Sequence, residues 1–547
     1  MIDISIIDAS TMDSTQVLQS PHSAGQLLPF RQSLMAMLGM CFVIMLVAVD
    51  QTVVGTALPT IVSELHGFNL YAWVATSYLL TSVITIPIFG RLGDYYGRKP
   101  FVVAAIAVFT LASLLCGAAQ TMMQLVVARA LQGIGGGMLV GTAFACIPDL
   151  FPDSHVRLRW QVMISSAFGI ANAVGPSLGG VLTEHYGWRS VFYVNLPIGL
   201  LGAWFVVRYM PHLRQHQGGK IRLDWQGALL IAIALGTLQL LVELLPQNQA
   251  GGTLTVLALL SIASFVALIY WERRCPEPLL PLDMLRNRSL SLLFLLALLV
   301  GITLFTLIFY APLLLQGGFG LSPQEAGLLV TPLAASITIG SITNGRLITR
   351  MGNPIGMLYL GFALLICACV GLLSAHSSTA HGLVATYMAL AGLGIGFIMP
   401  NLTVFGQQIA GREHLGIATA LLQSLRMVGG MLGTAIVGTM VSHVYAYQVS
   451  STLSERVDAI SLTQLTDPRV LVDVESQTQL LTQWAAQHLD GAAILETTRT
   501  ALVAAIHSGM GVSLLVALIS LWFVRRMPSI RLERNTSTQP APTKTKS

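Results

Sequence analysis

Four charged residues stand inside long apolar runs of this 547-residue sequence: Asp50, Arg129, Glu243 and Arg426. A charge near the centre of a bilayer costs at least about 2.5–3.5 kcal/mol, so each becomes a candidate functional residue if these runs cross a membrane. No His-x-x-x-His or Gly-x-Ser-x-Gly pattern lies in the same runs. Their chemistry is therefore that of charge pairing and proton binding rather than bond cleavage.

Asp50 and Arg129 are expected at similar depths. Asp50 lies shortly before Pro59, where its run ends, and Arg129 lies shortly after Met122, where another run begins. At 1.5 Å per residue, the two charges lie about 13 Å and about 10 Å from the same membrane face. Opposite charges at one depth can pair. The pair could be purely structural, or Asp50 could take up a proton and so release one helix from the other.

Two other charges have open roles. Glu243 lies near the end of its run, where it could reach the headgroup region or recognise a cationic substrate. Arg426 lies deeper in its run, and an internal repeat described below places it at the position of Asn172. These three residues, with Gln51 and Tyr78, are the candidate substrate contacts.

The runs that hold these charges dominate the chain. Only 10% of the residues are charged and 54% are apolar, the mean hydropathy is +0.72, and soluble domains carry about 25% charged residues. The sequence therefore predicts an all-α polytopic membrane protein. Runs close to the 20 residues that a spanning helix needs number fourteen, at residues 34–59, 72–89, 101–119, 122–147, 162–183, 191–207, 225–245, 254–270, 290–312, 326–344, 355–373, 383–404, 416–441 and 502–524.

The basic residues indicate the orientation in the membrane. With the N-terminus inside, most of the 29 Lys and Arg residues fall in cytoplasmic segments, and the outer loops hold only Arg189, Arg456, Arg469 and Arg499. By the positive-inside rule we expect a multi-pass protein of the cytoplasmic (inner) membrane with both termini in the cytoplasm. Since the basic residues are scattered over short loops, no nucleic-acid partner is expected.

The chain repeats itself internally. The string Gly-Arg-Leu-x-x-x-x-Gly occurs at residues 90–97 and again at residues 345–352, and glycine-rich strings at 133–137 and 392–396 support the same offset. We expect two six-helix pseudo-repeat bundles with a substrate site between them and alternating access. The predicted organisation is a cytoplasmic tail (1–33), an N-terminal bundle (34–209), two inserted helices (210–288), a C-terminal bundle (289–526) with a long outer loop (442–500), and a second tail (527–547).

A polar segment after the second run combines glycine with charge. Gly90 and Gly97 flank Asp94, and Arg98 and Lys99 follow. The glycines would permit a tight cytoplasmic loop, and the carboxylate could bind Arg98 or cap a helix N-terminus of the other bundle. The alternative is ordinary positive-inside charge.

The outer half of the fifth run is rich in small residues, namely Gly169, Gly175, Pro176, Gly179 and Gly180. They could act as a hinge or give a flat packing face.

The outer loop 442–500 carries Leu481, Trp484, Ala485 and Leu489 at helical spacing. This apolar face could dock a periplasmic adaptor protein or pack on the rest of the chain as a cap.

Six segments together resemble the major facilitator superfamily, in particular its fourteen-span drug:proton antiporter branch (EmrB/QacA-like). They are residues 49–59, 90–99, 129–137, 169–180, 187–197 and 223–227. The resemblance implies a proton-coupled exporter of lipophilic or cationic drugs, with Asp50 and Arg129 in proton coupling, segment 90–99 in the cytoplasmic gate and segment 169–180 as the antiporter signature. The chain departs from the family pattern at Gly55, where asparagine is usual.

Other functions are weighed against this one. An exporter of one endogenous metabolite or siderophore would have the same fold, and an intramembrane enzyme would need a nucleophile or metal cluster that the runs do not show. An ATP-driven pump would need a Gly-x-x-x-x-Gly-Lys-[Ser/Thr] loop, which does not occur in the sequence. We expect no cofactor and no metal; the expected partners are protons, the lipid bilayer and a small lipophilic or cationic substrate.

Overall fold

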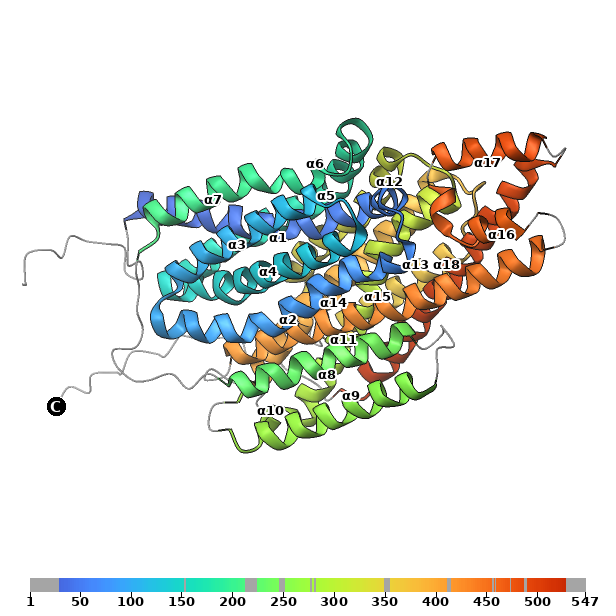
Figure 1. Cartoon of the computed structure of the whole chain (residues 1–547). Helices are drawn as coiled ribbons and strands as arrows, with labels where there is room; N and C mark the ends of the chain where they lie inside the picture. The colour runs from blue at the N-terminus through green and yellow to red at the C-terminus, as the bar shows by residue number, and fades with distance from the viewer. Residues whose placement is uncertain are drawn as a thin grey trace, which may run out of the picture.

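The computed structural model describes residues 29–151, 154–211, 224–244, 251–275, 278–279, 282–348, 355–410, 415–454, 457, 459–472, 474–486 and 489–527. Regular structure in these ranges is helical. Thirteen of the described helical segments are long and apolar enough to cross a membrane. Most long helices run roughly along one direction, as a membrane-spanning bundle requires (Figure 1).

The first seven helices form an N-terminal group. This group contains α1 (Phe30–Leu65), α2 (Tyr71–Tyr96), α3 (Arg98–Ala118), α4 (Met122–Leu150), α5 (Ser154–Tyr186), α6 (Ser190–Tyr193) and α7 (Asn195–Tyr209). Helix α2 packs on α4, α4 packs on α3, and α1 packs on both α5 and α7. Pro197 falls in the first turn of α7, where its missing N–H removes no helical hydrogen bond.

A C-terminal group packs in the same way. It contains α11 (Arg288–Leu313) with the π-helical turn η3 (Leu314–Gly318), α12 (Pro323–Ile348), α13 (Gly356–Leu373), α14 (His381–Ala410), α15 (Leu415–Leu453) and α18 (Gly491–Val524). Helix α12 packs on α14, α14 on α13, and α11 on α15 and α18. Asn287 begins α11 by accepting hydrogen bonds from the N–H groups of Ser289 and Leu290.

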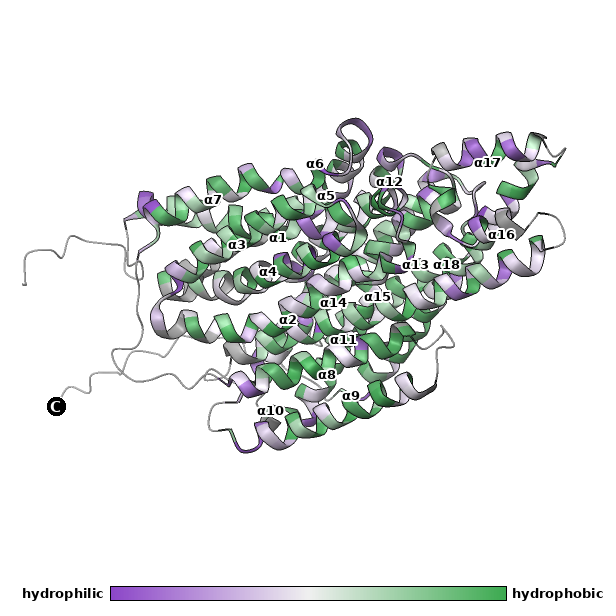
Figure 2. Ribbon diagram, in the orientation of Figure 1, coloured by the Kyte–Doolittle hydropathy of each residue, from purple (hydrophilic) through white to green (hydrophobic). Residues whose placement is uncertain are grey.

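Two further long helices lie between the two groups in the chain, and one of them, α8, contacts both groups. Helix α8 (Trp225–Leu244) packs on α9 (Gly251–Glu272) and also on α2 and α15, one helix from each group, and the short α10 (Leu282–Arg286) precedes α11. Asp224 fixes the start of α8 to the end of α9, because its Oδ1 accepts from Gly227 N and Trp271 Nε1, each at 2.7 Å. Most of helix α9 is hydrophobic (Figure 2), and the side chains of Val256, Leu259, Ile262 and Val266 are mostly exposed, as expected of a helix that faces lipid.

The fifth expected span differs from the others. Residues 162–183 lie within α5, a helix of 33 residues that is not among the thirteen candidate spans. Its glycines, serines and Asn172 lower its mean hydropathy relative to its neighbours. The sixth expected span begins with the short α6, followed by α7.

The outer segment is shorter and more ordered than expected. Helix α15 continues to Leu453 and α18 begins at Gly491, so residues 442–453 and 491–499 are helical, not loop. Between them lie α16 (Ala459–Leu465), η5 (Pro468–Leu471) and α17 (Val474–Ala486), which gather at one end of the bundle (Figure 1). We call residues 454–490 the cap.

Two large apolar side chains of α17, Leu480 and Trp484, are buried within the protein. Trp484 is fully buried and its Nε1 donates to Ser461 Oγ at 3.2 Å. The turn η5 contacts α1, η3 and α18. Among the described residues of the cap, no large apolar side chain is mostly exposed. These contacts favour a cap that packs on the transmembrane helices over a surface for an adaptor protein.

We expect Trp484→Ala to loosen the cap. Removing a buried tryptophan side chain costs about 3–5 kcal/mol of stability. The remaining contacts of the short helix α17 are too few to compensate for this loss. The measurement is the rate of tryptic cleavage between residues 454 and 490 in membranes accessible from the outer side. Gln483→Ala, a change at the exposed neighbouring position, is the matched control, and equal cleavage rates for the two variants would show that the Trp484 side chain does not hold the cap.

Candidate functional site

An ion pair lies in the interior of the N-terminal group. Arg129 Nη1 of α4 is 2.6 Å from Asp50 Oδ2 of α1, and the two side chains are 1% and 0% exposed. The structure thus pairs the two charges that the sequence places at similar depths. Because both are withdrawn from solvent, each is costly unless its remaining hydrogen-bonding capacity is also satisfied.

Three further polar residues surround the Asp50 carboxylate. Its Oδ1 accepts from Gln132 Nε2 at 2.7 Å and from Asn195 Nδ2 at 3.0 Å. Gln132 Oε1 accepts from Arg129 Nη1 at 2.6 Å, and Ser113 Oγ lies 2.7 Å from Gln132 Nε2 and 3.3 Å from Asn195 Nδ2. The carboxylate is therefore held directly by groups from α4 and α7, which Ser113 of α3 supports, and all five residues are buried. We call these five residues the Asp50 network.

Tyr78 belongs to the same site. The Cζ atom of Arg129 lies 4.5 Å from the centroid of the Tyr78 ring, a cation–π contact. Arg129 Nε also donates to the carbonyl of Val74 at 3.2 Å. Tyr78 is 1% exposed, so it supports the arginine instead of lining an open space, whereas Gln51, beside Asp50, is partly exposed.

The small residues of α5 pack against α1 close to Asp50. A Cβ atom at Gly175 would lie 1.8 Å from Thr52 Oγ1, and one at Gly179 would lie 2.7 Å from the carbonyl of Val53. Any larger residue would push α5 away from the helix that carries Asp50.

The same segment packs against α12 of the other group. A Cβ atom at Gly180 would lie 2.5 Å from the carbonyl of Pro323, and one at Gly169 would lie 2.4 Å from Thr338 Cγ2. The carbonyl of Pro176 stands 2.4 Å from where a Cβ of Gly327 would be. These contacts give the segment a packing role on two sides of α5.

The segment 90–99 is more helical than the sequence suggests. Gly90 lies inside α2, and only Gly97, with φ of 92°, interrupts the helices before α3 begins at Arg98. Arg98 is buried, and Lys99 Nζ donates to the carbonyl of Val207 at 2.8 Å. The expected loop is therefore wrong at Gly90; Gly97 alone makes the turn, because its positive φ is unfavourable for other residues. The side chain of Asp94 lies outside the described residues.

The other candidate substrate contacts are apart from the Asp50 network. Asn172 Nδ2 donates to the carbonyl of Phe168 in its own helix at 3.0 Å. Arg426 of α15 makes a contact of 3.8 Å from Nη1 to Met399 Sδ of α14. The side chain of Glu243 lies outside the described residues.

The two groups of helices are in contact at one end of the bundle, the end that the sequence predicts to face outward. Tyr71 Oη of α2 donates to the carbonyl of Phe309 of α11 at 2.6 Å, and Gln316 Nε2 of η3 donates to the carbonyl of Thr56 of α1 at 2.8 Å. Gln324 N at the start of α12 donates to Glu184 Oε2 of α5 at 2.9 Å. We call this set of contacts the outer seam.

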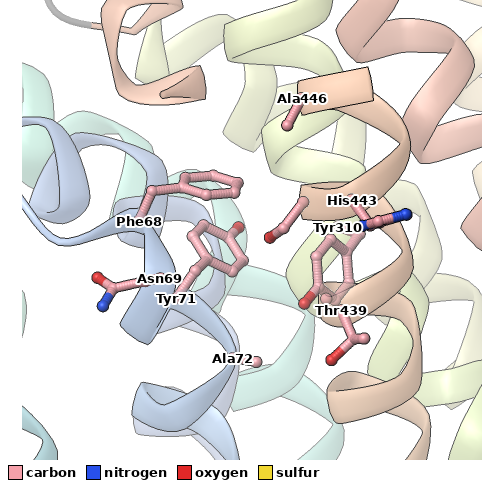
Figure 3. Close-up of a pocket in the computed structure, with 10 residues that line it drawn as sticks. Phe68, Asn69, Tyr71, Ala72, Tyr310, Thr439, His443 and Ala446 are labelled. Carbon is pink, nitrogen blue, oxygen red and sulfur yellow. The ribbon is translucent and has the colours of Figure 1, made fainter. Parts of the chain in front are cut away.

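A cavity of about 240 Å³ lies in the outer seam between α2 and α15 (Figure 3). The rings of Tyr71 and Tyr310 border it with their centroids 5.4 Å apart. Gly438 of α15 also lines it, and a Cβ there would be 3.0 Å from Ala72 Cβ.

Among the described residues no group of three or more His, Cys, Asp or Glu side chains is placed to hold a metal ion.

We expect Gln132→Met to lower stability and to impair the export that the family resemblance implies. Methionine keeps the volume but removes the amide that bonds Asp50, Arg129 and Ser113, leaving buried polar groups unpaired at about 1–3 kcal/mol each. The expected result is a lower midpoint of thermal unfolding and at least about a tenfold loss of transport rate at saturating substrate. Gln408→Met, a change on α14 far along the chain from the Asp50 network, provides the comparison; equal effects of the two substitutions would contradict this role for Gln132.

Long apolar helices in two groups, joined by a seam and enclosing a buried acid–base pair, define an integral membrane protein of the carrier type. The chain belongs to the Major Facilitator Superfamily, whose profile matches residues 40–434. It is therefore a multi-pass membrane transporter and not an enzyme.

Relatives with known names support the same class. The chain is 34% identical over 401 residues to the multidrug transporter protein MdtP of Bacillus subtilis, covering 72% of this chain and 73% of that protein. It is 33% identical over 419 residues to multidrug resistance protein 3 of the same organism, covering 76% and 81%. It is 30% identical to the tetracenomycin C resistance and export protein of Streptomyces glaucescens over 405 residues, covering 73% and 74%.

A solved structure shares the fold. A bacterial homolog of the human lysosomal transporter Spinster, in an inward-facing and unoccupied conformation, superposes with a TM-score of 0.63 at 14% identity. The match covers 92% of this chain and 99% of that one.

Proposed function

We propose that this protein is a proton-driven exporter of small lipophilic compounds in the cytoplasmic membrane. The observation that carries the proposal is the buried pair of Asp50 and Arg129, fixed by the Asp50 network. The names of the relatives, two for multidrug transport or resistance and one for resistance and export, support export of foreign or toxic compounds.

In this mechanism Asp50 carries the coupled proton. Protonation removes the negative charge that Arg129 Nη1 contacts at 2.6 Å, so the attraction between α1 and α4 falls. Gly175 and Gly179 transmit the shift of α1 to α5, because both lie directly against it. A proton that crosses the full membrane potential supplies about 2.3 kcal/mol per 100 mV, enough to drive compounds outward against a gradient.

Alternating access follows from the two helix groups. We propose that the chain crosses the membrane fourteen times, because α5 adds one span to the thirteen candidate spans. We also propose that both termini lie in the cytoplasm. The N-terminal bundle is residues 34–209, the inserted helices are residues 210–288, and the C-terminal bundle is residues 289–526. In the N-terminal group α2 packs on α4, and in the C-terminal group α12 packs on α14. These corresponding contacts support the internal repeat. The outer seam would be the closed outer gate, and segment 90–99 would belong to the cytoplasmic gate.

The experiment is transport by purified protein in sealed vesicles with an imposed pH gradient. A panel of lipophilic compounds is added, and collapse of the gradient is followed with a pH-sensitive dye. Proton-driven export predicts that transported compounds collapse the gradient and that an uncoupler stops their uphill movement. Uphill transport that persists without a proton gradient would contradict the proposal. The width of the panel that is transported separates an exporter of many drugs from an exporter of one metabolite.

A further inference from the structure

Arg426 is a cation without an ionic partner in the interior of the C-terminal group. Its Nε is buried without a hydrogen-bond partner, and its Nη1 contacts only a thioether sulfur, Met399 Sδ at 3.8 Å. No carboxylate among the described residues lies within ion-pair distance of its guanidinium. A charge in this position is costly on its own, so its retention calls for a partner that the folded chain does not supply.

Arg426 lies against two neighbouring helices of the C-terminal group. Its carbonyl oxygen lies 2.0 Å from where a Cβ of Gly301 on α11 would stand, and its side chain reaches Met399 on α14. Arg426 of α15 therefore contacts both α11 and α14. The residue is nevertheless partly exposed, so part of it is accessible to a ligand.

The charge balance of the interior points to the sign of that ligand. In the N-terminal group, the positive charge of Arg129 is neutralised by Asp50. Arg426 thus contributes a positive charge that no described carboxylate neutralises. It repels cationic compounds and attracts anions, and its planar guanidinium suits carboxylate and sulfonate groups, which can accept two parallel hydrogen bonds.

We propose that Arg426 binds the acidic group of the exported compound, so that the substrates are lipophilic organic anions. Met399 contacts the apolar body of such a compound next to the acid, because a thioether side chain is flexible and polarisable. This inference rests on the proposed export function and gives it a substrate class. It departs from the cationic substrates that the family resemblance suggests.

The test uses two probes with the same aromatic body. 8-Anilinonaphthalene-1-sulfonate carries a sulfonate, and N-phenyl-1-naphthylamine lacks it. The full-length protein is reconstituted in vesicles of phosphatidylcholine alone, so that no anionic lipid headgroup competes for Arg426. For each probe, the concentration giving half-maximal collapse of an imposed pH gradient is measured. Ethidium, a lipophilic cation, is the third probe.

The wild type is expected to respond to the sulfonate at a concentration about tenfold lower than to the amine. Arg426→Gln should raise the half-maximal concentration of the sulfonate by about tenfold to a hundredfold, the loss typical of a hydrogen bond to a charged group. It should leave the value for the amine unchanged. Arg426→Lys, which keeps the charge but not the paired donors, should fall between the two. Arg526→Gln removes an exposed cation at the end of α18 and should change neither value.

Four results would overturn the proposal in different ways. An equal loss for both probes in Arg426→Gln would show that the arginine serves packing. A wild type that responds to ethidium and not to the sulfonate would refute the substrate class and leave export intact. A wild type in which none of the three probes, nor any other compound of the panel, collapses the gradient would refute the export function itself. If the effect of Arg426→Gln appears only after phosphatidylglycerol is added, the ligand of Arg426 is a lipid headgroup, and the proposal is again wrong.

Discussion

Asp50→Asn is expected to abolish substrate-driven proton movement while substrate exchange across the membrane continues. An asparagine cannot change its charge, so the variant cannot alternate between the paired and released states of α1 and α4. Loss of a proton-transferring group lowers the rate of the step that it serves by about 10²–10⁴-fold. Exchange of labelled for unlabelled substrate needs no net proton transfer, and it should stay within about threefold of the wild type by the same reasoning.

The measurement compares both activities in one preparation of vesicles. Proton release is followed with a dye, and exchange is followed with a labelled compound. The variant leaves Arg129 buried without its partner, which can cost about 3–5 kcal/mol of stability. The double variant Asp50→Asn/Arg129→Gln removes both charges and provides a folded control that should exchange substrate but not move protons. Normal proton release by either variant would show that Asp50 does not carry the coupled proton.

The core of this site could be predicted from the sequence because depth follows from helix rise. Asp50 and Arg129 were placed within a few ångström of each other along the membrane normal, and the structure pairs them at 2.6 Å. Gln132 could have been added by the same logic. It lies three residues after Arg129, on the same helix face, and its amide contacts both charged partners.

The rest of the Asp50 network could not be predicted in this way. Ser113 and Asn195 belong to α3 and α7, which are apolar nearly all round. In such helices the hydrophobic pattern does not fix which face turns toward the protein. The contact of Asn195 Nδ2 with Asp50 Oδ1 at 3.0 Å therefore depends on tertiary packing alone. A polar residue in an apolar run was the only available signal, and Ser113 gave even less, since serine can satisfy its hydroxyl within its own helix.

Glycine explains two differences between expectation and structure. The glycines at 90 and 97 predict the same loop by composition, yet Gly90 is helical and faces the carbonyl of Gly141, whereas Gly97 makes the turn. Sequence cannot separate a glycine needed for its backbone angle from one needed for close approach. In the same way α5 falls short of the apolarity of the other spans because its small residues serve contact with α1 and α12.

Gly55, where the chain departs from the family pattern, is a glycine needed for close approach of two helices. A Cβ atom there would lie 2.7 Å from the carbonyl of Ile308 on α11. One residue further along α1, the carbonyl of Thr56 accepts the hydrogen bond from Gln316 that forms part of the outer seam. Gly55 is thus a point at which α1 of one helix group approaches the backbone of α11 in the other, and no side-chain rearrangement can make room for a larger residue.

Gly55→Val should therefore separate α1 from α11, keep the outer seam open and so prevent the transporter from closing its outer end. Overpacking costs about 1–3 kcal/mol, which corresponds to a shift of about 5-fold to 150-fold in the balance between closed and open outer ends. The readout is the labelling rate of Thr439→Cys, in the seam cavity, by a membrane-impermeant maleimide in a background whose native cysteines are replaced. Labelling should rise by about tenfold and transport should fall by a similar factor.

Gly236→Val on α8 is the matched control, since a Cβ at that glycine meets no atom within 4 Å. If Gly55→Val and Gly236→Val give the same labelling rate and the same transport rate, the contact at Gly55 does not hold the outer seam closed. The gate must then depend on the contacts of α2 with α15 or of α5 with α12.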